Sequence, residues 1–339
     1  MEVINKNMQN LNNAYGLMEM IRAHVQLPVL GKVLIVCATT DDNYAKYSNM
    51  VKPDRDGEIR FFSTLESAFA AADSNRDDVI VLAGHSTHVL ATGIAWSKNR
   101  VHVIGFDGGD RLVQQGSKIE ITGAVDIAYA LKVTGVRNSF RNIKFIQSST
   151  HANALNVVQF AGEGSLYKNC SFLFGNNSNT DLTTSAEALV GEDSGTFINC
   201  SFGNDNILST GARNIFAFDA IAGSASGGVG AKNNRFVDCE FITVTSEANT
   251  VLVKVVDTGA VEYLNKFTRP QFHAILHSGA GGVAITNAVQ SIGSLTGGSV
   301  DLYIPASFNC TNLCNTLSAN IKTYGAVTSA QAGEAGTPS

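Results

Sequence analysis

The sequence has little charge, few prolines and a single tryptophan. Of its 339 residues, 16% are Asp, Glu, Lys or Arg, against the ~25% usual in globular domains. Lys and Arg number 24 and Asp and Glu number 29, so the formal net charge is −5. A nucleic-acid-binding protein would instead carry a basic patch or stripe. We therefore predict that the protein has no nucleic-acid partner.

The sequence also lacks long apolar runs and a secretory signal. No run approaches the ~18–20 apolar residues of a membrane helix, and Val33–Cys37 is typical of the short runs present. The first thirteen residues show no basic region followed by an apolar one. We predict no membrane partner and synthesis in a reducing cytosol, where disulfides are not expected. The six cysteines form no C-x-x-C pair, which argues against a zinc ribbon or a thioredoxin motif.

Apolar residues at helical spacing mark the N-terminal region, residues 1–30. Leu11, Tyr15, Met18, Ile21 and Val25 follow this spacing until Pro28 ends it. This pattern predicts a helix that either packs on its own domain or anchors an assembly.

A second helix is expected from about residue 63 to residue 72. Ser63 or Thr64 can cap it, and Glu66 fits a capping box with Ser63. Buried strands are expected at Val79–Ala83 and Val101–Phe106.

An internal repeat begins near Ser139. Four segments share the order aromatic, any residue, Asn or Asp, Ile or Cys, polar residue, Phe; they are 139–145, 166–172, 196–202 and 235–241. Their Asn or Asp residues, at 142, 169, 199 and 238, lie 27, 30 and 39 residues apart. Repeats of this length indicate a solenoid, a propeller or an array. Because the segments are short, alternating and separated by Gly/Asn-rich turns, they favour a β-solenoid.

In a parallel β-helix each coil lies on the previous one at about 4.8 Å, so equivalent residues stack. Cys170, Cys200 and Cys239 are therefore predicted to form one buried apolar column. A metal or catalytic role would need His or carboxylate partners that the motif lacks. Low charge also fits stacked coils, because each coil covers its neighbours.

The repeat fades after residue 250. Short strands are expected at 251–256, 283–286 and 300–304, either as final coils or as a separate cap. Cys310 and Cys314 are expected to be two unpaired buried thiols rather than metal ligands. We thus predict an N-terminal helical anchor (1–30), a parallel β-helix (31–250), a β-rich C-terminal region (251–328) and a disordered tail (329–339).

Several stretches resemble known families. Residues 64–68, 78–81, 84–85 and 101–105, with the Asn/Asp-Cys-x-Phe segments, resemble the pectin-lyase-like right-handed β-helix proteins. The resemblance implies an all-β parallel solenoid whose end is capped by a short helix. Residues 52–57 and 60–65, followed by Gly84-His85, resemble virion proteins of tailed bacteriophages. This closer resemblance implies a structural virion component, often trimeric.

Fold does not decide function, so the candidate chemistry has to come from the residues. Asn179-Thr180-Asp181 matches the first motif of polygalacturonase-type enzymes, while Asp77-Asp78 and Gly84-His85-Ser86 match the others only out of order. The order favours a chance match.

The remaining polar candidates are isolated. Glu192 and Asp219 have the pattern of solvated turn acids, and His85 and His88 do not sit on a helix. We therefore predict no catalytic, cofactor-binding or metal-ligating residues and no cofactor.

The preferred interpretation is a trimeric β-helical protein that decorates a bacteriophage capsid or forms a head spike, and that is not an enzyme. Its expected location is the virion. Its expected partners are further copies of itself and the major capsid protein or other virion proteins, with a host surface glycan as a further candidate. The alternative is a tail spike that binds or depolymerises host surface polysaccharide, and Asp181, Glu192 and Asp219 would then be the first residues to test. A non-phage adhesin or secreted enzyme is disfavoured because no signal peptide is seen.

Overall fold

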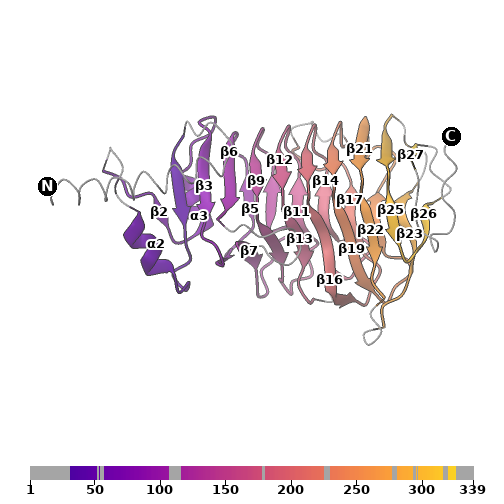
Figure 1. Ribbon diagram of the computed structural model, residues 1–339, viewed down its shortest axis with the longest axis horizontal. Helices are drawn as coiled ribbons and strands as arrows, with labels where there is room; N and C mark the ends of the chain where they lie inside the picture. Colours follow the sequence, from indigo (N-terminus) through magenta and orange to yellow (C-terminus); the bar gives the residue numbers. More distant parts are fainter. Residues whose placement is uncertain are drawn as a thin grey trace.

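The chain forms an elongated right-handed parallel β-helix, as Figure 1 shows for the computed structural model. The structure describes residues 31–51, 53, 57–106, 116–177, 180–224, 230–276, 281–292, 295, 297–315 and 320–325. The predicted N-terminal helix, the predicted tail and residues 52 and 54–56 of the phage-like segment lie outside these ranges. The predicted fold class is confirmed.

Three parallel sheets run along the axis, and each complete coil, from β3 to β26, contributes one strand to each of them. Sheet A contains, in spatial order, β2 (Phe61–Phe62), β1 (Val33–Val36), β3 (Asp78–Leu82), β6 (Val101–Gly105), β9 (Ser139–Arg141), β12 (Leu166–Lys168), β15 (Thr196–Ile198), β18 (Arg235–Val237), β21 (Leu264–Thr268), β24 (Ser299–Tyr303) and β27 (Ile321–Tyr324). Sheet B contains β4 (Thr87–Val89), β7 (Lys118–Ile121), β10 (Lys144–Gln147), β13 (Ser171–Phe174), β16 (Ser201–Ser209), β19 (Glu240–Thr245), β22 (Gln271–Ala274) and β25 (Ala306–Phe308). Sheet C contains β5 (Ile94–Trp96), β8 (Leu131–Val133), β11 (Asn156–Phe160), β14 (Ala186–Val190), β17 (Asn214–Phe218), β20 (Val251–Val255), β23 (Ile285–Ser291) and β26 (Cys310–Cys314).

Two short helices lie at the N-terminal end of the solenoid (Figure 1). Helix α3 (Leu65–Ala71) is the predicted one, and its cap is Thr64, whose Oγ1 accepts the Ser67 N–H at 3.2 Å. Glu66 accepts the Ala91 N–H at 3.1 Å. Helix α2 (Tyr44–Met50) was not predicted, because it has no apolar face and buries no residue. Neither helix is long or apolar enough to cross a membrane.

The repeated sequence motif is the corner between sheets A and B. In the third repeat, Phe197 on β15 and Phe202 on β16 are buried in the core, and Asn199 and Cys200 between them turn the chain. Asn199 has a φ of 53°, in the left-handed region that Asn tolerates better than most residues. The same left-handed corner recurs in the neighbouring coils at residues 142, 169, 238, 269, 304 and 325.

Stacked amides reinforce this corner. The Asn169 Nδ2 donates to Asn142 Oδ1 at 3.1 Å, and the Asn199 Nδ2 donates to Asn169 Oδ1 at 2.9 Å. In later coils an ion pair replaces the amides, with Arg269 Nε donating to Asp238 Oδ1 at 2.7 Å. Side chains at one sequence position therefore bond the next coil, in addition to the backbone ladder.

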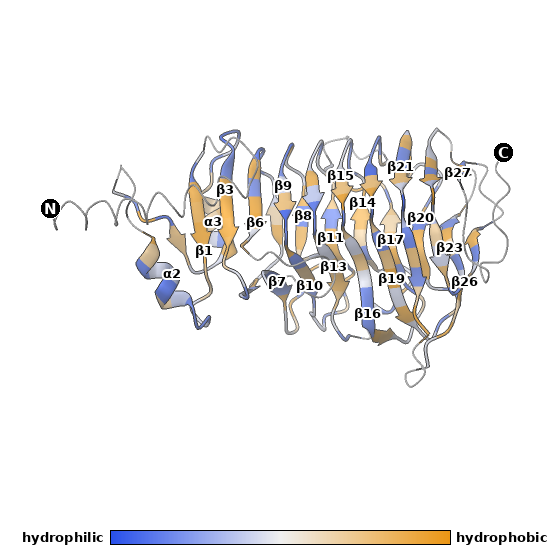
Figure 2. Cartoon of the chain, in the orientation of Figure 1, coloured by the Kyte–Doolittle hydropathy of each residue, from blue (hydrophilic) through white to orange (hydrophobic). Residues whose placement is uncertain are grey.

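The inward side of the same motif supplies the core. Figure 2 shows apolar residues concentrated along the strands. Stacked rings form one column in sheet A, with successive centroids 4.3–5.6 Å apart, and another in sheet B, with centroids 5.1–5.3 Å apart: Phe140, Tyr167, Phe197, Phe236 and Phe267; Phe145, Phe172, Phe202, Phe241 and Phe272. Cys170, Cys200 and Cys239 are free thiols with 0% exposure, and burial raises the pKa values of Cys200 and Cys239. The predicted buried cysteine column is present.

Strands after residue 250 continue the same three sheets. For example, β21 pairs with β24 and β24 with β27 in sheet A. Cys310 and Cys314 are free thiols at opposite ends of β26. Four residues of extended chain separate their Cα atoms by roughly 13 Å, well beyond the reach of a disulfide.

The Asn199 corner gives a direct test of the stacking argument. Asn199→Ala should lower the free energy of unfolding by about 1–3 kcal/mol, because Ala tolerates the left-handed region poorly and cannot bond Asn169. Asn199→Gly keeps the backbone freedom and should cost less. Urea unfolding of both variants measures the difference. An equal loss in both variants would contradict a conformational contribution at this corner.

Candidate functional site

The corner between sheets B and C is where the coils differ from one another. The A–B corner is a two-residue turn in the repeats, and the corner between sheets C and A also has left-handed residues in successive coils, such as Arg137, Gly164 and Ser194. By contrast, the B–C connection spans residues 148–155 in one coil and 175–185 in the next. Variable loops on a rigid scaffold are the usual location of binding and catalytic groups.

A bulge in β16 enlarges this corner. The pairing of β16 with β19 passes from Gly203 opposite Ile242 to Leu208 opposite Val244, so the four residues 204–207 on β16 face the single residue Thr243 and the bulge adds three residues. Gly203 has a φ of +95°, and a Cβ there would collide with the Ile242 carbonyl oxygen. The Asn204 Oδ1 accepts the N–H groups of Asn206 and Ile207 at 2.9 and 3.2 Å, which shapes the extra loop.

A pocket of about 240 Å³ lies between this bulge and the 175–185 loop. The lining is mostly polar, with Ile207 and Leu208 as its apolar side chains. The lining residues are Gly175, Asn176, Asn177, Asp181, Ile207, Leu208, Thr210 and Arg213. The volume is smaller than the ~300–1,000 Å³ typical of pockets for drug-sized ligands, and it therefore suits one unit of a longer chain.

Asp181 is held firmly at the pocket. Its Oδ1 accepts the Ser209 hydroxyl at 2.7 Å, and its Oδ2 accepts the Thr210 N–H at 2.8 Å and the Thr210 hydroxyl at 3.1 Å. The side chain is 10% exposed. The bulged strand thus supplies all three of these donors and fixes the carboxylate from one side.

Arg213 lies between two carboxyl groups. Its Nη1 is 3.6 Å from Asp181 Oδ1, and its Nη2 is 3.3 Å from Glu187 Oε1. The guanidinium carbon also sits 5.6 Å from the centre of the Phe174 ring. Arg213 is 2% exposed and Glu187 is fully buried. Asp181 and Arg213 line the pocket, whereas Glu187 holds the guanidinium from behind.

Burial raises the pKa of Glu187 to about 7, although Arg213 opposes that shift. The carboxyl groups of Asp181, at the pocket, and of Glu187, fully buried, therefore share the Arg213 guanidinium. Glycan hydrolysis generally uses a pair of carboxyl groups as acid and as base or nucleophile. The arrangement can bind a polar ligand and, near neutral pH, can hold or release a proton.

Most of the other polar residues singled out in the sequence lie elsewhere. Asp78 is buried and accepts the backbone N–H groups of Lys32 and Asp73, both at 2.7 Å. Asp77 pairs with Arg100, whose hydrogen bond lowers the pKa of the Asp77 carboxyl. Both belong to the first coils, so the structure does not bring this Asp-Asp pair to Asp181. Asn179 lies outside the described residues.

Glu192 and Asp219 were predicted to be solvated turn acids, and Glu192 is not. Glu192 is fully buried, accepts the Ser165 N–H at 3.2 Å, and has a pKa raised by burial to about 8. Asp219 is half-buried directly after β17, and burial also raises its pKa. Neither lines the pocket beside Asp181.

His85 and His88 do not face a common point. His85 lines a separate polar pocket of about 370 Å³ with Asp41 and Asp42. His88 is 2% exposed, and burial lowers its pKa to about 4. In the part of the chain that the structure describes, no three His, Cys, Asp or Glu side chains gather as a metal site.

One buried chain of groups resembles a hydrolytic triad in residue type. The His102 Nδ1 lies 2.9 Å from Ser139 Oγ, and its Nε2 lies 3.5 Å from Asp77 Oδ1. Ser139 is only 3% exposed, so a substrate carbonyl has no access to its hydroxyl. We assign this chain a structural role.

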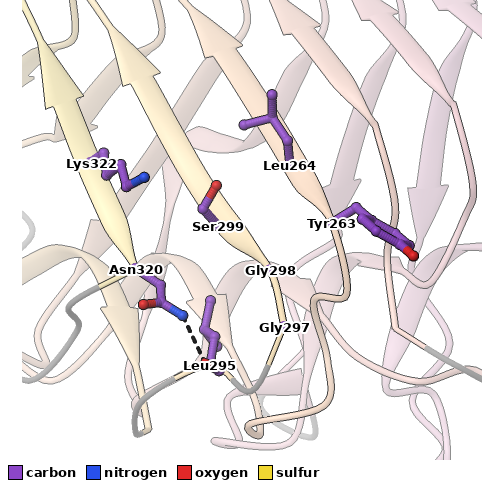
Figure 3. Close-up of a pocket in the computed structure, with 8 residues that line it drawn as sticks. All are labelled: Tyr263, Leu264, Leu295, Gly297, Gly298, Ser299, Asn320 and Lys322. Atoms are coloured by element: carbon purple, nitrogen blue, oxygen red, sulfur yellow. Dashed lines mark hydrogen bonds between the residues drawn. The ribbon is translucent and has the colours of Figure 1, made fainter.

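A third pocket, of about 330 Å³, lies on the last coils (Figure 3). Tyr263, Leu264, Ser299 and Lys322 come from neighbouring strands of sheet A and the turn before them, and Asn320 donates to the Leu295 carbonyl at 2.8 Å. Figure 3 shows the Tyr263 ring directed away from Lys322. The lining includes no carboxylate, so we favour the Asp181 pocket as the candidate site.

Sequence reasoning missed Arg213 and Glu187. Both had a signal: Glu187 interrupts the apolar run Ala186–Val190, and Arg213 directly precedes the apolar strand Asn214–Phe218. Charged residues inside or next to apolar strands are costly unless they are paired. Their meeting at one point depends on the β14–β17 pairing register, which the sequence does not reveal.

Comparison with known proteins supports the fold. No protein-family model and no curated protein matches the sequence. Among solved structures, pectate lyase Pel9A is 12% identical with a TM-score of 0.51, over 92% of this chain and 80% of that one. The pectin methylesterase from Aspergillus niger is 14% identical with a TM-score of 0.51, over 86% of this chain and 80% of that one. ORF18 of Geobacillus virus E2 is 10% identical with a TM-score of 0.49, over 90% of this chain and 57% of that one.

These similarities correct one prediction. The chain was expected not to be an enzyme, yet two of the structures it resembles are enzymes named for their action on pectin. The prediction of no enzymatic activity is therefore contradicted. At 12–14% identity the similarity to the pectate lyase and the pectin methylesterase establishes the fold alone.

The buried Glu192 carboxyl predicts a pH-dependent stability. Its pKa of about 8 in the folded chain exceeds the ~4.3 of a free Glu. The protonated acid is compatible with burial, so the contribution of this group to stability is largest below about pH 4.3. Stability falls as the pH rises toward 8, by about 1.4 kcal/mol per unit of pKa difference.

Glu192→Gln is neutral at every pH and should remove this dependence. The measurement is urea unfolding of both proteins from pH 5 to pH 9. The advantage of the variant should grow as the pH rises. Parallel pH profiles for the two proteins would contradict the assignment.

Proposed function

We propose that this chain is a β-helical spike of a bacteriophage particle that binds and depolymerises polysaccharide on the host surface. The observation that carries the proposal is the Asp181–Arg213–Glu187 arrangement in a pocket at the variable corner. A fold known from enzymes that act on pectin gives such a pocket a suitable scaffold. The phage assignment is supported by the sequence resemblance of residues 52–57, 60–65 and 84–85.

In this proposal Asp181 is the carboxylate that contacts the sugar. Its three fixed donors hold it in one orientation, which favours a reactive geometry. Arg213 would stabilise negative charge that develops on a sugar oxygen. Glu187 is a positioning residue, because it contacts the guanidinium and not the pocket.

The proposed role of Asp181 predicts loss of cleavage in Asp181→Asn. Removing a carboxylate that transfers a proton or attacks the sugar should lower the rate at least about 100-fold. The assay is release of reducing ends from purified bacterial capsular polysaccharides, with pectin included. Asp219→Asn is the matched control, since Asp219 does not line the pocket, and it should retain the activity. Full activity in Asp181→Asn, or loss in Asp219→Asn alone, would contradict the site.

The proposed spike is a homotrimer located in the virion, bound to other virion proteins. Light scattering after size exclusion should give a mass three times that of the 35.8 kDa chain. Electron microscopy of the particle would locate the protein on the head or the tail. A stable monomer that is absent from every particle would overturn the virion part of the proposal.

A further inference from the structure

The charges at the Asp181 pocket nearly cancel. Asp181 and Arg213 are the lining residues that carry formal charge, and they have opposite signs. Glu187 lies behind Arg213 and has a pKa of about 7. The group of three is therefore neutral when Glu187 is protonated and has one negative charge when Glu187 is ionised. At no pH where Asp181 is ionised does the pocket have an excess of positive charge.

The pocket also offers both a hydrogen-bond acceptor and a hydrogen-bond donor to a ligand. A carboxylate can accept about four hydrogen bonds, and Asp181 already accepts three. The Arg213 Nη1 is 3.6 Å from Asp181 Oδ1, which is beyond hydrogen-bond distance. An unused acceptor position and a donor therefore lie next to each other at the pocket, beside the exposed Thr210.

We infer that the pocket selects a neutral sugar unit with adjacent hydroxyls rather than an acidic sugar. A hydroxyl both donates and accepts, so one can donate to Asp181 while its neighbour accepts from Arg213. Ile207 and Leu208 line the pocket and offer apolar surface on which the C–H face of a sugar ring can pack. This inference rests on the proposed function and names its substrate class.

The carboxylate of an acidic sugar would be repelled by Asp181 in this pocket. Its carboxylate could reach Arg213 only by lying next to Asp181, and two like charges about 4 Å apart repel each other. Sites that recognise carboxylates instead leave an arginine free for bidentate contact. Arg213 is already flanked on both sides, by Asp181 and Glu187. The pocket thus discriminates against acidic sugars by repulsion as well as by fit.

The test uses polysaccharides in charge-matched pairs. The acidic probes are polygalacturonate and a panel of acidic bacterial capsular polysaccharides. Each is offered in its native acidic form and in its carboxyl-reduced neutral form. Capsular polysaccharides that are neutral by nature complete the panel. Binding is measured by affinity electrophoresis at low and high salt. The wild-type chain should bind neutral members of the panel, with less than a twofold change in affinity between the two salt concentrations.

Variants separate charge from shape. Asp181→Ala should lose at least tenfold in affinity for the neutral ligand. Asp181→Asn keeps the size but removes the negative charge, so it should gain salt-sensitive binding to acidic members that the wild type rejects. Lys322→Ala, in the pocket of Figure 3, is the matched control and should behave as wild type.

Wild-type binding confined to acidic members and weakened by salt would overturn the inference while leaving the proposed function intact. An Asp181→Asn variant that binds only neutral members would also overturn it. No binding of any polysaccharide by the wild type or by Asp181→Asn would overturn the proposed function itself, and this inference with it.

Discussion

The whole molecule depends on the left-handed corner between sheets A and B. Each coil must turn sharply there, so that its aromatic residues on both sides of the corner stack on those of the next coil. Asn169 and Asn199 meet both requirements, because Asn tolerates positive φ and its amide bonds the coil below. A different corner in one coil would displace two strands at once, and the columns of rings would lose their register.

This regularity explains where the variation lies. Two corners are fixed by left-handed residues, so longer or shorter coils are accommodated mainly at the B–C connections and in the segment after β17. The 30-residue spacing from Asn169 to Asn199, against 27 in the preceding coil, reflects the longer 175–185 loop. The bulge after Gly203 adds three more residues in the next coil. The pocket forms between these two insertions, which means that the irregular coils and the candidate site are the same feature.

The sequence predicted the periodic part of the molecule well. The motif around Asn142, Asn169, Asn199 and Asp238 is sufficient to predict the parallel coils and the buried column of Cys170, Cys200 and Cys239. Helix α3 was predicted from its cap, although Thr64 caps it and the capping box with Ser63 is not used. Helix α2 was missed because it has no buried face, so its residues read as a polar loop.

The site could not be predicted in the same way, because it depends on contacts between coils at non-repeating positions. Asp181 was noted from its tripeptide and was then judged a chance match, since the other two motifs are out of order. Its partners come from elsewhere: Arg213 from the connection before β17, and Glu187 from within β14. The β14–β17 pairing sets Asn214 opposite Ala186 and so brings Arg213 to Glu187, whereas Ser209 and Thr210 at the end of β16 hold Asp181.

The energetics of this group argue that it is kept for a reason other than stability. Removing two charges from water costs several kcal/mol per ion, and replacing a buried ion pair by apolar residues is often neutral or stabilising. Moreover, Glu187 and the Nε and Nη2 atoms of Arg213 have no hydrogen-bond partner among the described residues. The surrounding coils show that this position can be apolar, since Val157, Ile215 and Leu252 are buried at or near the same level of sheet C. At the position of Glu187 the neighbouring coils have apolar residues, and the incompletely hydrogen-bonded charged pair occurs beside the pocket, where the charges can act on a ligand.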